Sequence, residues 1–366
     1  MGSAESAGGR LGAVLSAPRT GVVPLGPGAW LTTTPALARQ VLTDTVRFDF
    51  PDNVARTGDL SASRGDTRSG HVVFTPLTSD QVAHGHDVFV AEWAAVLEEH
   101  QRITPQEPYD AMELLRQPVA RATCAAVLPA TDTHLRDEVA DRVLAWIDSL
   151  APVISAARPP HRWSRARRAE RAARQSAEEA IAAVPGLDVA PQQWAVLLAA
   201  GIQVPIAAGA WLLSWAATHP WAAADTADAV WETLRLTPPT WITARLATED
   251  VDIAGHAVPA GSVVLVSPLL LGRLDQLVPG ADPARDEFRP GRWRDTDRRP
   301  GAWLPFGAGP HACPGRGLGT SLLVHLAEWA ASRDLVLSED VGIDQSRGLA
   351  PAACRFMVLT RRESPE

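Results

Sequence analysis

The sequence predicts a mainly α-helical protein with a small β portion, built as a single domain over residues 1–366 in which residues 1–28 form a short N-terminal extension. Three observations predict this class. Apolar residues recur with a period near 3.6 through most of the first two thirds of the chain, as on the buried face of a helix. Short alternating segments with turn residues appear after residue 236. With 46% hydrophobic and 21% charged residues, the chain can also bury a large core.

The first part of the chain is dominated by helical periodicity. It predicts helices over residues 34–42, 79–100, 108–126, 132–150 and 164–183. A further helix over 194–218 carries no charge in 25 positions and is long enough to span a bilayer. Because Gln203 and Pro205 lie near its centre and no basic anchors flank it, we interpret it as a helix buried inside the domain.

Strands and a long loop follow. After a helix over 221–236, the residues typical of strands lie at 242–246, 251–253 and 263–267, with a turn at 254–256. Between residues 279 and 310 Asp, Arg, Gly and Pro are frequent, which indicates a long ordered loop before an apolar helix over 318–331. A long loop inside a compact protein usually carries functional residues.

Charge and cysteine content exclude several classes. A net charge of −8, with all 34 basic residues arginine, argues against a nucleic-acid-binding protein. Cys124, Cys313 and Cys354 are odd in number and widely spaced, which predicts a reducing compartment and neither a disulfide framework nor a zinc site. The first ten residues lack the apolar core of a signal peptide. We therefore expect a cytoplasmic protein.

The most specific motif ends the long loop, where Phe306 to Gly315 read Phe-Gly-Ala-Gly-Pro-His-Ala-Cys-Pro-Gly. A thiolate at the start of a helix is stabilised by the partial positive charge there, which depresses its pKa and lets it ligate iron. Glycines in such a loop let the backbone turn sharply beside a flat macrocycle. The segment resembles the haem-binding signature of the cytochrome P450 family, and a chance match is on the order of one in ten thousand.

The resemblance implies a cytochrome P450 fold, haem b (iron protoporphyrin IX) as cofactor and Cys313 as the metal ligand. The implied cofactor-binding residues are Phe306, Gly307, Gly309, His311, Cys313, Gly315 and Arg245. Phe306 would shield the sulfur from water. His311 and Arg245 would reach the haem propionates, because a buried propionate is costly without a cation. On the early helix neither His84 nor His86 can be assigned to a propionate.

Glu232 and Arg235 resemble the E-x-x-R pair of the family, and their spacing places both side chains on one helix face. Glu113 and Arg116 have the same spacing but lie in the helical first third of the chain. Arg292 belongs to a downstream segment that resembles the family's F-x-P-x-R-W motif. The resemblance implies a structural ion pair in which one carboxylate binds two guanidinium groups and holds the long loop to the core.

The helix over 194–218 should cross the distal face of the haem, and there the chain departs from its family. The usual centre reads A-G-x-[DE]-T, whose acid and alcohol help to deliver protons during dioxygen activation. The corresponding catalytic positions here are Ala200, Gly201, Gln203 and Val204. An amide and an isopropyl group cannot shuttle a proton by ionising.

The implied activity is monooxygenation of a small, partly hydrophobic molecule, an intermediate of bacterial secondary metabolism. Ala200, Ile202 and Val204 are expected to line the substrate pocket, and the segment between Asp49 and Val73 is expected to act as a lid. A ferredoxin or flavodoxin with its reductase would supply electrons from NAD(P)H. Neither a nucleic acid nor a membrane is expected as a partner.

Three explanations of the missing acid and alcohol stay open. The substrate could supply its own hydroxyl or a bound water, which preserves monooxygenation. The enzyme could instead use peroxide, or an already activated substrate without dioxygen, for a rearrangement, dehydration or group transfer. The chain could also be a non-catalytic haem-binding sensor, which would need a sixth ligand from the protein. Gln203 is a poor ligand for iron, and Val204 and Pro205 are none.

Overall fold

The computed structural model describes residues 4, 8–50, 73–129, 132–154, 156, 160–275, 278, 285–294 and 301–359. They belong to two compact units. The helical unit comprises residues 76–230 and 315–366, and the sheet unit comprises residues 2–75 and 231–314. Most of the described secondary structure is helical, with small sheets, which confirms the predicted fold class.

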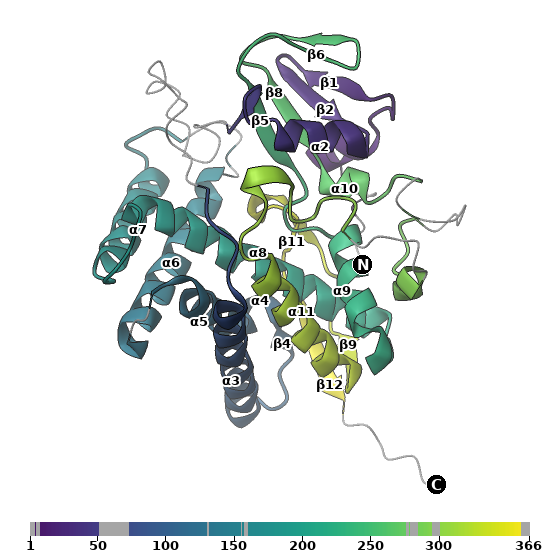
Figure 1. Ribbon diagram of the computed structural model, residues 1–366. Coiled ribbons are helices and arrows are strands. Elements are labelled where there is room, and N and C mark those ends of the chain that lie inside the picture. Colours follow the sequence, from purple (N-terminus) through teal and green to yellow (C-terminus); the bar gives the residue numbers. More distant parts are fainter. Residues whose placement is uncertain are drawn as a thin grey trace. The chain divides into compact units, whose positions relative to one another are not determined.

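Long helices make up most of the helical unit (Figure 1). They are α3 (Ser79–Ile103), α5 (Arg116–Val127), α6 (Thr133–Ile154), α7 (Arg165–Ala182), α8 (Pro191–Thr218) and α11 (Arg316–Ala331). α8 contacts α5, α6, α7 and α11. It is long and apolar enough to cross a membrane, but its most apolar 18-residue window is 61% buried inside the structure. That burial favours a core helix over a membrane span.

Among its described residues the helical unit also contains two small antiparallel sheets. One has the order β4-β12-β9, formed by β4 (Tyr109–Asp110), β12 (Arg355–Leu359) and β9 (Asp334–Leu337). In the other, β10 (Ile343–Asp344) pairs with β11 (Ala350–Pro351). Nε1 of Trp211 in α8 donates to the backbone carbonyl of Leu349 at 2.8 Å, which ties the core helix to this region.

The helix predicted over residues 108–126 is wrong at its start. The structure has β4, then α4 (Ala111–Leu114), and only then α5. The carboxylate of Asp110 accepts from the backbone N–H of Met112 at 3.0 Å and so caps α4. The backbone N–H of Ala111 donates to the carbonyl of Cys354 at 2.8 Å. Because this partner is far along the chain, local periodicity could not reveal the break.

A five-stranded sheet forms the centre of the sheet unit (Figure 1). Its order is β1-β2-β8-β5-β3, with β1 (Val22–Gly26), β2 (Ala29–Thr32), β8 (Val263–Val266), β5 (Thr243–Ala247) and β3 (Phe48–Asp49). β2 and β8 are parallel, and the other neighbours are antiparallel. α2 (Pro35–Thr43) contacts β2 and β8. The hydroxyl of Thr34 accepts from the backbone N–H of Leu37 and caps this helix.

Shorter elements complete the sheet unit. They are α1 (Gly9–Leu15), the hairpin of β6 (Val251–Ile253) and β7 (His256–Val258), α10 (Pro268–Leu271) and the 3-10 turns η3 (Pro290–Arg294) and η4 (Gly309–His311). α9 (Thr226–Leu236) begins in the helical unit and ends in the sheet unit. α1 and β1 lie within residues 1–28, which the sequence predicts to be an extension, and β1 is the edge strand of the main sheet.

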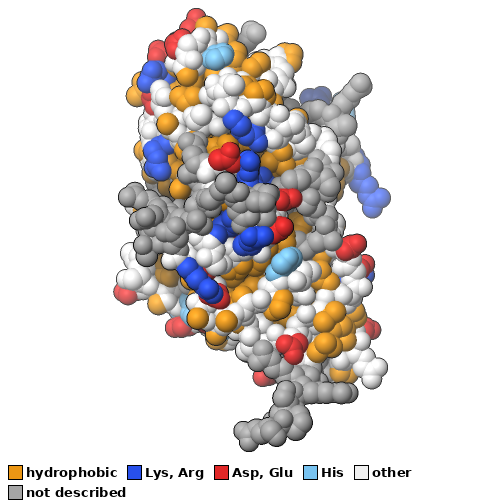
Figure 2. Space-filling view, turned by 90° about the vertical axis from the view of Figure 1, so that its right-hand side faces the viewer, with side chains coloured by type: hydrophobic (Ala, Val, Ile, Leu, Met, Phe, Trp, Pro, Cys, Tyr) orange, Lys and Arg blue, Asp and Glu red, His pale blue; other side chains and the backbone are white. Residues whose placement is uncertain are grey.

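Charges of both signs are interspersed on the surface. Figure 2 shows arginine and acidic side chains lying close to one another, with apolar side chains among them, on the face that it draws. Alternating signs shorten the range of the electrostatic field, because neighbouring charges screen each other.

Candidate functional site

Backbone hydrogen bonds hold residues 306–314, the cysteine loop, in a defined shape. The backbone N–H of Cys313 donates to the carbonyl of Phe306 at 2.9 Å and closes the loop. Inside it, the backbone N–H of Gly307 donates to Leu304 at 3.0 Å, and that of Ala312 donates to Gly309 at 3.0 Å. The side chain of Cys313 is exposed. The loop therefore presents its thiol at its own surface, two residues before the N-cap of α11.

The backbone conformation of the loop requires glycine at two positions, and close packing adds a second reason at one of them. Gly307 and Gly309 have φ of +70° and +73°, where side chains with a Cβ are strained. A Cβ on Gly309 would also lie 2.7 Å from the carbonyl oxygen of Leu42, so the loop packs closely on the end of α2. Gly315 is different, because its φ is −89° and a Cβ there would meet nothing within 4 Å.

Replacing Gly309 by alanine is expected to distort the cysteine loop, because the new Cβ meets backbone atoms that cannot rotate away. We expect a loss of about 1–3 kcal/mol in the free energy of unfolding, measured by denaturant titration. Gly315→Ala is the matched control and should change stability by less than about 0.5 kcal/mol. Equal effects of the two variants would contradict the tight packing of the loop on α2.

Aromatic rings back the cysteine loop. Trp231 makes edge contacts with Phe306, at a centroid distance of 6.3 Å, and with Trp303 at 6.1 Å. Trp293 lies 5.1 Å from Trp303. Trp303 is fully buried, whereas Phe306 is half-buried. This cluster packs against the ring of Phe306, whose backbone carbonyl accepts from the N–H of Cys313.

The side chains of Arg245 and His311 both contact one phenylalanine ring in the sheet unit. The guanidinium carbon of Arg245 lies 3.8 Å from the ring centroid of Phe50, and the ring of His311 contacts the same ring at 4.6 Å. Thus the structure brings together the two residues that the sequence analysis assigns to the haem propionates.

Arg245 is buried in β5 and has only neutral hydrogen-bond partners among the described residues. Nη1 donates to the carbonyl of Ala244 at 2.9 Å and to the hydroxyl of Thr243 at 3.4 Å. No described carboxylate forms an ion pair with this guanidinium. Burial lowers the pKa of Arg245 to about 10, and the charge of Asp49 opposes this shift only in part. A buried cation with this imbalance fits an anionic group such as a propionate.

The three cysteines differ in burial, and this difference shows which of them can bind a metal. Burial raises the pKa of Cys124 and of Cys354 to about 12, so both are protonated thiols at neutral pH. A metal ligand must be a thiolate. Cys313 is the exposed cysteine and the one followed by a helix N-terminus. These residues fit a haem held by Cys313, with Arg245 and His311 toward its carboxylates.

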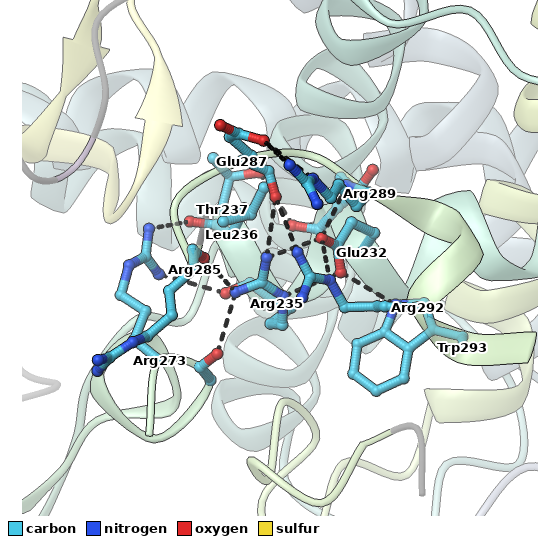
Figure 3. A network of polar contacts seen from close by, with 12 residues as sticks. Glu232, Arg235, Leu236, Thr237, Arg273, Arg285, Glu287, Arg289, Arg292 and Trp293 are labelled. Atoms are coloured by element: carbon cyan, nitrogen blue, oxygen red, sulfur yellow. Dashed lines mark hydrogen bonds and ion pairs between the residues drawn. The ribbon is translucent and has the colours of Figure 1, made fainter. Parts of the chain in front are cut away.

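Glu232 is the centre of a buried polar network (Figure 3). Its two carboxylate oxygens accept from Nη2 and Nε of Arg235 at 2.7 and 2.9 Å and from Nε of Arg292 at 2.8 Å. They also accept from Nε1 of Trp293 and from the backbone N–H of Arg289, each at 3.0 Å. Glu232 and Arg235 are both fully buried. The structure therefore brings together the three residues expected to form the structural ion pair.

The arginines of this network also bind the backbone of the long loop. Arg235 donates to the carbonyls of Gly272, Arg285 and Glu287 at 3.2, 2.7 and 3.2 Å. Arg292 donates to the carbonyl of Glu287 at 3.3 Å. The network thus attaches the described part of the loop to α9. By contrast, Glu113 is 73% exposed and lies 3.8 Å from Arg116.

In the helical unit, the first half of α8 keeps one face exposed. Gln192, Val196 and Ala200, spaced four residues apart, are exposed, and Val204 is half-buried. Side chains four apart lie on one helix face. Ile202, in contrast, is fully buried on another face. The exposed face therefore includes Ala200 and Val204 of the expected pocket wall but not Ile202.

Gly201 and Gln203 occupy other faces of α8. A Cβ on Gly201 would lie 3.0 Å from Cγ2 of Thr123, so this glycine allows α5 to approach closely. Gln203 is half-buried, and its Nε2 has no hydrogen-bond partner among the described residues. It is therefore a donor that a bound polar group could use.

The histidines of α3 and the expected lid are two further features that the sequence analysis named. On α3, His84 is exposed, while His86 makes an edge contact with His325 of α11 at 5.7 Å. Residues 51–72 of the expected lid lie outside the described residues. The contacts of Phe50, Thr123 and Trp231 were missed by the sequence analysis, because they depend on partners far along the chain.

Part of the chain is similar in sequence to known proteins. The sequence profile named Cytochrome P450 matches residues 226–326. Cyclooctat-9-en-7-ol 5-monooxygenase of Streptomyces melanosporofaciens is 38% identical over 111 residues, which are 30% of this chain and 23% of the relative. Sterol 14alpha-demethylase of Mycolicibacterium vanbaalenii is 37% identical over 89 residues, which are 24% and 20% of the two chains. The matches thus span less than a quarter of the length of these relatives.

Solved structures resemble the chain over most of its length. CYP175A1 from Thermus thermophilus has a TM-score of 0.68 and 19% identity, with 90% of this chain and 89% of that chain covered. CYP164A2 from Mycobacterium smegmatis, solved with econazole bound, has a TM-score of 0.62 and 16% identity, with 92% and 93% covered. At these identities the comparison shows a shared fold.

Proposed function

Because the chain belongs to the cytochrome P450 family, we propose that it is a haem-thiolate monooxygenase that oxidises a small, partly hydrophobic molecule. The observation that carries this proposal is the cysteine loop. This loop presents the exposed thiol of Cys313 just before the N-terminus of α11. The sheet unit, which contains the loop, also holds the buried Arg245, with which no described carboxylate forms an ion pair. An anionic cofactor that takes a thiolate ligand satisfies both features.

Haem b would be held by the thiolate of Cys313, with Arg245 and His311 binding its propionates. A bound haem supplies the power to insert one oxygen atom of dioxygen into a substrate C–H bond, while the other atom leaves as water. With haem bound, the ring of Phe306, which Trp231 contacts, would shield the sulfur from water.

The residues of α8 bind and orient rather than transfer protons. The exposed side chains of Ala200 and Val204 offer a small apolar surface to a substrate. The amide of Gln203 can donate a hydrogen bond through Nε2 but cannot ionise near neutral pH. Protons for the reaction therefore come from a substrate hydroxyl or a bound water, which Gln203 can hold in place.

The proposed setting is the bacterial cytoplasm, with electrons delivered from NAD(P)H through a ferredoxin and its reductase. Arg316, exposed at the start of α11, is a candidate contact for an acidic electron carrier. A relative named for 5-monooxygenation of cyclooctat-9-en-7-ol supports an apolar substrate that carries a hydroxyl. Such a substrate, an intermediate of secondary metabolism, would bring its own proton donor.

A gain-of-function variant tests this assignment. Gln203→Glu combined with Val204→Thr restores the acid and the alcohol, so we expect faster oxygen consumption with a ferredoxin, its reductase and NADPH. A positioned general acid–base group contributes about 10²- to 10⁴-fold. Because a substrate hydroxyl or a bound water already delivers protons in the unmodified protein, the expected gain is smaller, about two- to tenfold. Gln192→Glu, at an exposed position of the same helix, is the matched control. An unchanged rate of oxygen consumption in the double variant would contradict the idea that α8 lacks the groups that deliver protons.

Labelled oxygen distinguishes the alternatives. With a panel of cyclic terpene alcohols and sterols under ¹⁸O₂, monooxygenation places one ¹⁸O atom in the product. A product that forms only with added hydrogen peroxide indicates use of peroxide. A product that forms without oxygen or peroxide indicates a rearrangement, dehydration or group transfer, and either result would overturn the proposal.

A further inference from the structure

Pro205 leaves a backbone carbonyl of α8 without its usual partner. In an α-helix the carbonyl of residue 201 accepts from the N–H of residue 205, but proline has no N–H. The proline ring also pushes against the carbonyl four residues earlier and turns it away from the helix axis. α8 nevertheless continues as one helix from Pro191 to Thr218. Something other than the helix must therefore satisfy the carbonyl of Gly201.

Thr123 of α5 provides the missing donor. Its hydroxyl donates to the carbonyl of Gly201 at 3.2 Å, across 78 residues of sequence. Thr123 is only 2% exposed, so water is a poor substitute at this position. The carbonyl that Pro205 frees is thus the one that a buried hydroxyl of the neighbouring helix reaches.

Gly201 makes this contact possible. A Cβ at residue 201 would lie 3.0 Å from Cγ2 of Thr123, which is closer than most real contacts. The absence of a side chain lets α5 and α8 approach closely enough for the hydroxyl to reach the carbonyl. Three residues therefore act together: Gly201 gives the space, Pro205 frees the carbonyl and Thr123 donates to it.

The segment stabilised in this way carries the functional face of α8. Ala200, Gln203 and Val204 lie within one turn of the Gly201 carbonyl. A kink or local opening at this point would move all three side chains. We infer that Thr123 is a positioning residue, whose hydroxyl replaces the helical bond lost at Pro205 and holds the substrate-facing segment of α8 in place. The substrate-facing role of that segment rests on the proposed function.

A double-mutant cycle tests the inference by hydrogen exchange of the purified protein. We expect Thr123→Val to speed amide exchange in peptides covering residues 198–211 on the order of tenfold, because a buried carbonyl loses its donor. Pro205→Ala restores an N–H that can donate to Gly201. In the Pro205→Ala background, Thr123→Val should therefore change exchange less than about twofold.

Controls separate positioning from general destabilisation. Thr123→Ser keeps the hydroxyl and should exchange like the unmodified protein in residues 198–211. Thr218→Val removes a hydroxyl that donates to the carbonyl of Ser214 at 3.1 Å, where the helix retains its own N–H, and should leave the segment unchanged. Faster exchange throughout the protein, equal effects in both backgrounds, or no effect of Thr123→Val would each overturn the inference. Because exchange needs no substrate, failure of the proposed activity would leave this result intact.

Discussion

Cys313→Ala is expected to abolish thiolate ligation and with it the activity. Removing a partner outside the ligand shell of a metal site typically costs about 10- to 100-fold in affinity or activity, and loss of the ligand itself should cost more. The variant should still fold, because Cys313 is exposed and its removal leaves no cavity. The measurement is the haem content of the purified variant, together with its absorption spectrum after reduction under carbon monoxide.

The other cysteines are the controls. Cys124→Ala and Cys354→Ala should retain haem and a thiolate spectrum, because burial raises the pKa of both thiols to about 12. Some loss of stability is expected from their buried positions, and Cys354 also donates from Sγ to the carbonyl of Ala210 at 3.4 Å. A thiolate spectrum that persists in Cys313→Ala, or that disappears in one of the controls, would show that another residue binds the iron.

Glu232→Gln is expected to have the largest effect on stability. The carboxylate is fully buried and accepts from Arg235, Arg292 and Trp293. Breaking a buried ion pair by removing one charged partner costs about 3–5 kcal/mol, since the remaining guanidinium groups stay buried without a counter-charge. We expect this loss in the free energy of unfolding, measured by urea titration followed by circular dichroism.

Glu113→Gln provides a control with the same sequence spacing to an arginine. Glu113 is 73% exposed and lies 3.8 Å from Arg116, so its loss should cost less than about 1 kcal/mol. Similar losses in the two variants would contradict the structural role of the Glu232 network. A stable but haem-free Glu232→Gln protein would instead assign the network to cofactor retention.

Local patterns predicted most of the helices. The cysteine loop could be predicted because its chemistry is confined to ten consecutive residues, and glycine, histidine and cysteine have specific uses there. The E-x-x-R pair needed its position in the chain to be told from Glu113 and Arg116. The structure shows the difference as burial, with Glu232 fully buried and Glu113 exposed.

Contacts between distant segments could not be predicted. β4 pairs with β12, and β2 pairs with β8, across more than 200 residues, so no local alternation marks them. Thr123 and Phe50 gain their roles only from partners in other segments. The expected pocket wall shows the same limit, because Ile202 lies on a buried face of α8, away from the face that carries Ala200 and Val204, and this depends on how α8 packs.

The central claim is that Cys313 binds haem iron as a thiolate beside an open distal position. The most direct measurement is the absorption spectrum of the purified, dithionite-reduced protein with and without carbon monoxide. We predict a strongly red-shifted Soret band on addition of carbon monoxide, as given by a thiolate-bound ferrous carbonyl. A protein without haem, a spectrum that carbon monoxide does not change, or an unshifted carbonyl band would contradict the claim and favour a non-catalytic haem binder or a protein without haem.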